Sequence, residues 1–150
     1  MSVRLSRSYA RRAVVQVLYQ LLVNDQEIAQ ENLDFVTSEN SDKMDTRYFK
    51  TLVEGISQKI DILNTELAFA ADRSIDSIDP VEISILRLAV YEFIHRSEIP
   101  YRVVLNEAVE LAKSLGGEQG YKYVNAVLDR IGLKFRSDEY KAANSISSKK

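Results

Sequence analysis

The sequence predicts an all-α fold from three observations. Its 150 residues include only five Gly and two Pro, which are few chain breakers for this length. Apolar residues recur every three or four positions along most of the chain, whereas no segment shows the alternation of a β-strand. The hydrophobic share of 45%, without a long low-complexity tract, is typical of a globular domain that buries a core.

Three helices are predicted in the first half of the chain. Residues 8–24 place apolar side chains at helical spacing, residues 26–37 form a weaker helix, and residues 38–45 form a polar connector. A long helix follows from about residue 46 to residue 70. Its apolar stripe recurs one turn after another and consists of Phe49, Leu52, Val53, Ile56, Ile60, Leu63 and Leu67.

The start of the next helix is marked by Asp79 and Pro80. Asp79 can accept hydrogen bonds from free backbone N–H groups, and Pro80 suits the first helical position. Glu82 stands where a capping box places an acid. The helix from residue 81 to about residue 95 is apolar on most sides, so we expect it at the centre of the fold.

Two further helices and a tail complete the predicted organisation. One helix runs from Pro100 to residue 115 and stops at Gly116, and the last helix spans residues 118–135. Residues 137–150 are polar and rich in serine, so we expect this tail to fray or to be disordered. The prediction is therefore a helical domain of residues 1–136 followed by a tail.

The composition argues against several classes of protein. Without cysteine there are no disulfides or cysteine metal sites, and the single histidine, His95, leaves little material for catalysis. The patterns GxxxxGK[ST], GxGxxG and HExxH are absent, so we expect no catalytic residue, metal or cofactor. The densest apolar stretch, residues 81–94, is too short for a bilayer, and no apolar segment of a signal peptide follows the basic N-terminus. A cytoplasmic protein without a membrane partner is expected.

Basic residues gather at the N-terminus of an otherwise acidic chain. The net charge is −2, yet residues 1–12 contain Arg4, Arg7, Arg11 and Arg12 and no acid. Such a basic arm indicates an anionic ligand at this end of the protein. The alternative, that the arginines only solvate a helix start, stays open at this point.

Two helical faces combine cations with a tyrosine ring. On the first helix Arg7 and Arg11 share a face, and Tyr19 aligns with Arg12. On the last helix Tyr123 lies outside the apolar stripe. Arginine binds phosphate through its planar fork, and tyrosine can stack on an unpaired base. Alternatively, Tyr123 packs at a helix crossing with its hydroxyl in water.

Six blocks of the chain resemble the NusB family of bacterial transcription antitermination factors, in the family's order and spacing over about residues 7–135. The blocks are Ala13-Val14-Val15-Gln16-Val17-Leu18-Tyr19, Tyr48-Phe49, Leu86-Arg87-Leu88-Ala89-Val90-Tyr91-Glu92, Ile99-Pro100-Tyr101, Asn106-Glu107-Ala108-Val109-Glu110-Leu111-Ala112-Lys113 and Val124-Asn125-Ala126-Val127-Leu128-Asp129.

The resemblance implies two packed helical subdomains of about six to seven helices and no enzymatic activity. It also implies binding of boxA RNA together with NusE, a small-subunit ribosomal protein. That complex joins NusA, NusG and RNA polymerase, notably on ribosomal RNA operons, and a homodimer is known within the family. A free-standing relative of the RNA-binding domain of ribosomal RNA cytosine-C5 methyltransferases, or a helical protein-binding scaffold, is the alternative. The methyltransferase would need a second domain, which we do not expect here.

The resemblance assigns roles by position. RNA contacts are implied for Arg7, Arg11, Tyr19, Gln119, Lys122 and Tyr123. Contacts to NusE are implied for Tyr19, Asp76 and Glu82. Gln119 stands where some relatives carry an acid, and Glu82 has the competing role in a capping box described above.

Overall fold

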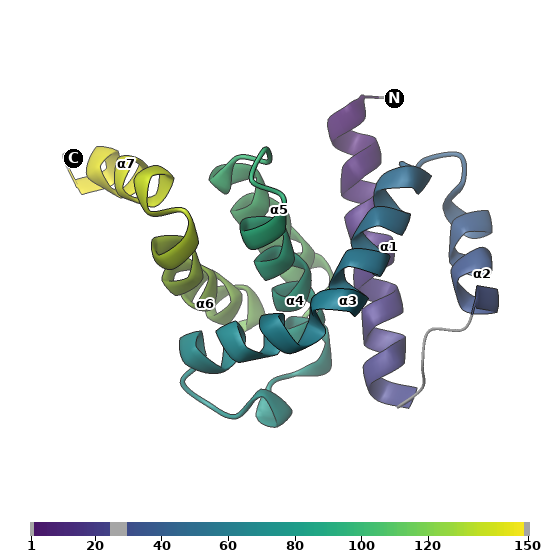
Figure 1. The fold of residues 1–150 in the computed structure, drawn as a ribbon, viewed down its shortest axis with the longest axis horizontal. Coiled ribbons are helices and arrows are strands. Elements are labelled where there is room, and N and C mark those ends of the chain that lie inside the picture. Colours follow the sequence, from purple (N-terminus) through teal and green to yellow (C-terminus); the bar gives the residue numbers. More distant parts are fainter. Residues whose placement is uncertain (1, 25–29, 149–150) are drawn as a thin grey trace. The chain divides into compact units, whose positions relative to one another are not determined.

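The computed structural model describes residues 2–24 and 30–148 of the chain (Figure 1). These residues form seven α-helices and one short 3₁₀ helix, with no β-strand among them. The all-α prediction is therefore confirmed. By its internal contacts the chain divides into two compact units, residues 1–59 and residues 60–150, which share the long helix α3 (Thr46–Ala70).

The first unit contains α1 (Val3–Asn24), α2 (Gln30–Asn40) and the first half of α3. Helix α1 begins five residues before the predicted start, because the side chain of Ser2 accepts a hydrogen bond of 3.1 Å from the backbone N–H of Leu5. Of the predicted second helix, residues 26–29 lie outside the described residues. The apolar faces of these helices are buried and include Ala10, Val14, Val17, Leu18, Val36, Phe49, Leu52 and Ile56.

Asp45 fixes the start of α3 beside α1. Its carboxylate accepts a hydrogen bond of 2.9 Å from the N–H of Tyr48, which caps the helix. Its own N–H donates to the carbonyl of Ser6 at 3.0 Å. Positions at the N-terminal end of α3 are thereby held against the basic segment of α1.

The second unit is built around α4 (Pro80–His95), which packs against α5 (Tyr101–Leu115) and α6 (Gly120–Phe135) (Figure 1). The prediction that α4 is central is confirmed, since ten of its residues are buried. Asp79 caps it by accepting from the N–H groups of Val81 at 2.9 Å and Glu82 at 3.2 Å.

Close packing in the second unit depends on Gly132. A Cβ atom there would lie 2.5 Å from Cε2 of Tyr101, too close for any side chain unless the ring moves. That ring is itself buried and stacks on Phe93 with the ring centroids 5.5 Å apart. Gly132 therefore allows α6 to approach the start of α5.

Residues 137–148 differ from the tail that we expected, since they form the helix α7 (Ser137–Ser148), and residues 149–150 lie outside the described residues. Its first turn carries Asp138 and Glu139, which favour a helix N-terminus. The Glu139 carboxylate accepts hydrogen bonds from the N–H of Tyr101 at 2.7 Å and from Arg136 at 2.9 Å. Tyr140 also meets the Tyr101 ring edge-on. Contacts distant in sequence thus order a segment that composition alone marks as frayed.

Candidate nucleic-acid interface

One face of α1 carries exposed cations and an exposed aromatic ring. Arg4, Arg12 and Gln16 are exposed, and Tyr19 exposes 39% of its surface. Their spacing of eight, four and three residues along the helix, with Ser8 midway between the first two, places them on one side of it. We call Arg4, Arg12, Gln16 and Tyr19 the α1 stripe, and its cations and ring are the groups that phosphates and unpaired bases bind.

Arg7 and Arg11 face the start of α3 instead. The guanidinium carbon of Arg7 lies 4.4 Å from the centre of the buried Tyr48 ring, and its Nε is 3.9 Å from the Asp45 carboxylate. Arg11 lies 5.5 Å from the same ring and exposes only 2% of its surface. Arg7 is partly accessible to a phosphate. For Arg11 the geometry disagrees with the implied phosphate contact and favours a structural role.

The sequence did contain the signal for this difference. Arg11 lies three residues before Val14 and seven before Leu18, so it shares the apolar face of α1. Arg12 is one residue further and points away from that face. The family position implied a phosphate contact for Arg11, whereas the helical register places Arg4 and Arg12 on the exposed face.

In the second unit Tyr123 is half-buried on α6 beneath an arginine. The guanidinium carbon of Arg73 lies 4.2 Å from the centre of the Tyr123 ring. The Tyr123 hydroxyl is buried and has no hydrogen-bond partner among the described residues, so it does not point into water as the packing alternative supposed. Burial raises the pKa of this hydroxyl, and Arg73 partly offsets the effect. The residue that covers the ring, Arg73, was missed from sequence because it is 50 positions away.

The other α6 residues with implied RNA contacts lie around Tyr123. Gln119 and Lys122 are exposed at the start of α6, where the Gln119 side chain makes no capping bond. Arg130, seven residues after Tyr123 on α6, donates a hydrogen bond to the carbonyl of Ala70. Arg130 therefore ties α6 to the end of α3.

The two acidic positions differ in their surroundings. Asp76 is exposed in the 3₁₀ helix η1 (Ile75–Ser77). Glu82 is half-buried, and its carboxyl group lies against Gly120, where a Cβ would approach it to 3.3 Å. Burial and the nearby Asp79 raise the pKa of Glu82, while Arg73 lowers it. Asp76 is thus open to a partner, whereas Glu82 is part of the packing beside Tyr123.

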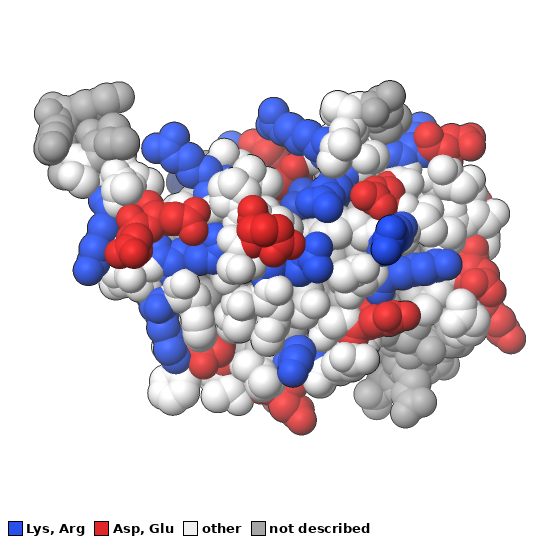
Figure 2. Space-filling model, turned by 45° about the horizontal axis from the view of Figure 1, so that its top comes forward, with Lys and Arg blue, Asp and Glu red and all other residues white. Residues whose placement is uncertain are grey.

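Charges of both signs alternate on the surface seen in Figure 2. Within the described residues no group of three His, Cys, Asp or Glu side chains could hold a metal ion. None of the described helices is long and apolar enough to cross a membrane. His95 packs against the Tyr91 ring, with the ring centroids 5.1 Å apart.

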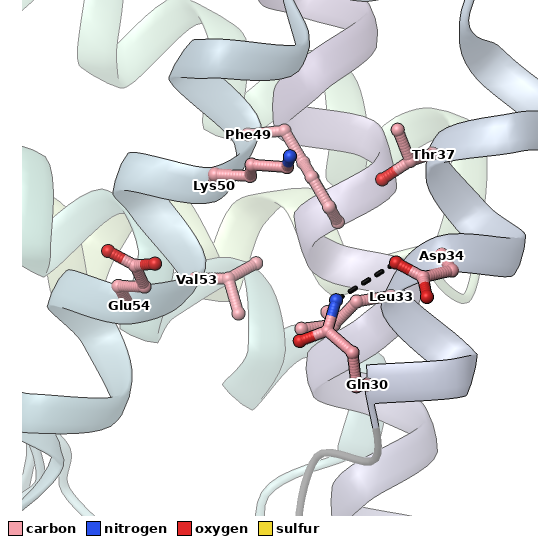
Figure 3. A pocket seen from close by; sticks show the side chains of 8 residues that line it. All are labelled: Gln30, Leu33, Asp34, Thr37, Phe49, Lys50, Val53 and Glu54. Carbon is pink, nitrogen blue, oxygen red and sulfur yellow. Dashed lines mark hydrogen bonds between the residues drawn. The ribbon is translucent and has the colours of Figure 1, made fainter.

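A pocket of about 190 Å³ opens between α2 and the first half of α3 (Figure 3). Leu33, Phe49 and Val53 supply its apolar wall. At its rim the Gln30 side chain donates to Asp34 at 2.9 Å. The polar side chains that line the pocket carry both signs of charge and do not point to a common centre in Figure 3. No residue of the α1 stripe lines this pocket.

Comparisons with known proteins agree on one family. The NusB family profile matches residues 8–132. Transcription antitermination protein NusB of Nitrosococcus oceani is 42% identical over 91% of this chain and 91% of its own length. The protein of the same name from Methylobacillus flagellatus is 42% identical over 90% of this chain and 88% of its own.

Solved structures give the same result. T. maritima NusB superposes with a TM-score of 0.78 at 26% identity, over 90% of this chain and 96% of that one. A crystal structure of the antitermination factors NusB and NusE in complex with double-stranded RNA has a TM-score of 0.76 at 30% identity, over 84% of this chain and 95% of that one. By sequence and by fold, this chain belongs to the NusB family.

Proposed function

We propose that this protein is a transcription antitermination factor that binds boxA-type single-stranded RNA together with NusE. The observation that carries the proposal is its likeness to the NusB protein solved with NusE and RNA, at 30% identity over most of both chains. Its curated relatives share the name of transcription antitermination protein. The protein acts in the cytoplasm by binding, without a catalytic step.

The α1 stripe supports RNA binding from this chain's own residues. Arg4 and Arg12 project from one helix face together with the exposed ring of Tyr19. Partly exposed Arg7 lies on the neighbouring face. Three such cations on single-stranded RNA correspond to a slope of about −2 in a plot of log affinity against log salt. Gln119, Lys122 and Tyr123 supply a second set of contacts.

The acidic positions support binding of NusE. Ribosomal proteins are commonly basic, and exposed Asp76 offers a carboxylate to such a partner. Tyr19 contacts NusE as well as the RNA. Glu82, whose carboxyl group lies beside Gly120, is a further contact to NusE. The larger assembly that we propose includes NusA, NusG and RNA polymerase on ribosomal RNA operons. Before it joins that assembly, the protein would be a homodimer.

The test is RNA binding with and without NusE, to a boxA RNA, its scrambled control and its duplex, at several salt concentrations. Tighter boxA-selective binding in the presence of NusE is the expected result. Equal weak binding to all three RNAs by a folded sample, unaffected by NusE, would reject the proposal and favour a helical scaffold for another protein. Arg102→Ala is the matched charge control, since Arg102 is exposed on α5 outside the proposed contacts.

A further inference from the structure

The loop after α3 places an arginine over the aromatic ring of the proposed RNA face. The guanidinium carbon of Arg73 lies 4.2 Å from the centre of the Tyr123 ring, which is the geometry of a cation–π contact. Half of the Arg73 side chain is exposed, and Tyr123 is half-buried beneath it. On this side of the ring the surface that solvent meets is the guanidinium.

The hydroxyl of Tyr123 has little to offer a ligand from this position. It is buried and makes no hydrogen bond to the described residues. Desolvation of that hydroxyl raises its pKa, so it stays neutral at physiological pH. The ring therefore acts as a support for Arg73, and any base approaching this face meets the arginine first.

The surrounding chain holds Arg73 in this place. Three residues earlier, the carbonyl of Ala70 accepts a hydrogen bond from Arg130 of α6, which anchors the end of α3. The Asp72 carboxylate lies 3.5 Å from Nε of Arg73. Glu82 lies near enough that Arg73 lowers its pKa. A guanidinium fixed on one side by an aromatic ring loses less side-chain freedom when a ligand binds the other side.

A supported guanidinium is a platform for a nucleobase. Arginine is weakly hydrated, and its plane stacks on the unpaired bases of RNA while its N–H groups remain able to reach phosphate. Resting on the function proposed above, we propose that Arg73, backed by the ring of Tyr123, stacks on an unpaired base of the bound RNA. The contact forms a layered stack of base, guanidinium and tyrosine ring.

The experiment measures binding of a fluorescent boxA RNA to the full chain with NusE present. Arg73→Ala should weaken binding by about 5- to 150-fold, the range for loss of one base stack. Arg73→Lys keeps the charge without the plane, so it should keep the salt slope and lose most of that affinity.

An abasic scan of the RNA identifies the stacked base. At one nucleotide, removing the base should cost as much as Arg73→Ala, and the two changes together should cost no more than either alone. Additive losses at every position would overturn the proposal. Equal binding by Arg73→Lys and the unmodified protein would also overturn the proposal and leave a simple charge contact. Tighter binding by Arg73→Ala would overturn it too, and would mean that Arg73 blocks access of the RNA to the Tyr123 ring.

The controls separate this inference from the proposed function. Arg102→Ala removes the same charge from an exposed site of the second unit and should leave binding unchanged. If the unmodified protein does not select boxA, the proposed function fails. If it does select boxA and Arg12→Ala weakens binding while the Arg73 variants do not, only the stacking inference fails. Circular dichroism checks that each variant is folded.

Discussion

Nε of Arg136 donates a hydrogen bond of 3.0 Å to the carbonyl oxygen of Phe93, 43 positions earlier in the chain. The same guanidinium donates to the carbonyls of Glu92, Arg96 and Ile99. Carbonyls at a helix C-terminus lack partners within the helix, and here α4 ends among these residues. Arg136 therefore caps the central helix from the junction of α6 and α7, and it is 7% exposed.

Arg136→Ala should lower the free energy of unfolding by about 2–4 kcal/mol, because it removes the donor of the buried carbonyl oxygens of Phe93 and Ile99. Urea unfolding followed by circular dichroism measures the loss. Exposed Arg102→Ala is the matched control and should change the free energy by less than about 0.5 kcal/mol. Equal midpoints for the two variants would show that the cap contributes nothing.

Glu139 should make the docking of α7 sensitive to acid. The N–H of Tyr101 holds the pKa of Glu139 below its ordinary value of 4.5, and Arg136 acts in the same direction. A lowered pKa in the folded state means that this stabilisation is present above pH 4.5 and is lost as the pH falls below it. Urea unfolding between pH 7 and pH 3 should therefore show a steeper loss for the unmodified protein than for Glu139→Gln. Parallel curves would contradict the role of this carboxylate.

The helix boundaries that sequence predicted best are those with local chemical signals. Asp79 and Pro80 mark the start of α4, and Gly116 follows the end of α5, as expected. For α7 the local signal is misleading, because serine-rich composition favours a frayed tail. Its order depends on Arg136 and Tyr101, which only the folded chain brings to it.

In the candidate site, too, the positions that local helical spacing decides are predictable from sequence, and the contacts between distant residues are not. The exposed position of Tyr19 follows from its alignment with Arg12, both of which local helical spacing gives. The burial of Arg11 follows from the same spacing, yet the family position pointed the other way. The pairing of Arg73 with Tyr123 joins a loop to a helix 50 positions later, and no local pattern predicts which arginine would cover the ring.

Arg11 and Arg12 should respond oppositely to alanine. Arg12→Ala removes an exposed cation, so it should flatten the salt slope of RNA binding by roughly 0.7 and lower stability less than Arg11→Ala does. Arg11→Ala removes a buried side chain beside Tyr48, so it should lower the free energy of unfolding by about 1–3 kcal/mol with no change in slope. RNA titrations over a salt series and urea unfolding measure both quantities. A flatter slope for Arg11→Ala alone would restore the phosphate contact that the family position implies.

Gly132→Ala should destabilise the second unit by about 1–3 kcal/mol, because its Cβ would overlap the Tyr101 ring. That ring cannot move freely, since it is buried and stacked on Phe93. Gly117→Ala is the matched control: a Cβ there meets nothing within 4 Å, so stability should stay the same or rise slightly. Thermal and urea unfolding compare the two variants. Equal stability would mean that α5 and α6 separate at little cost, and the close approach at Gly132 would then not hold the second unit together.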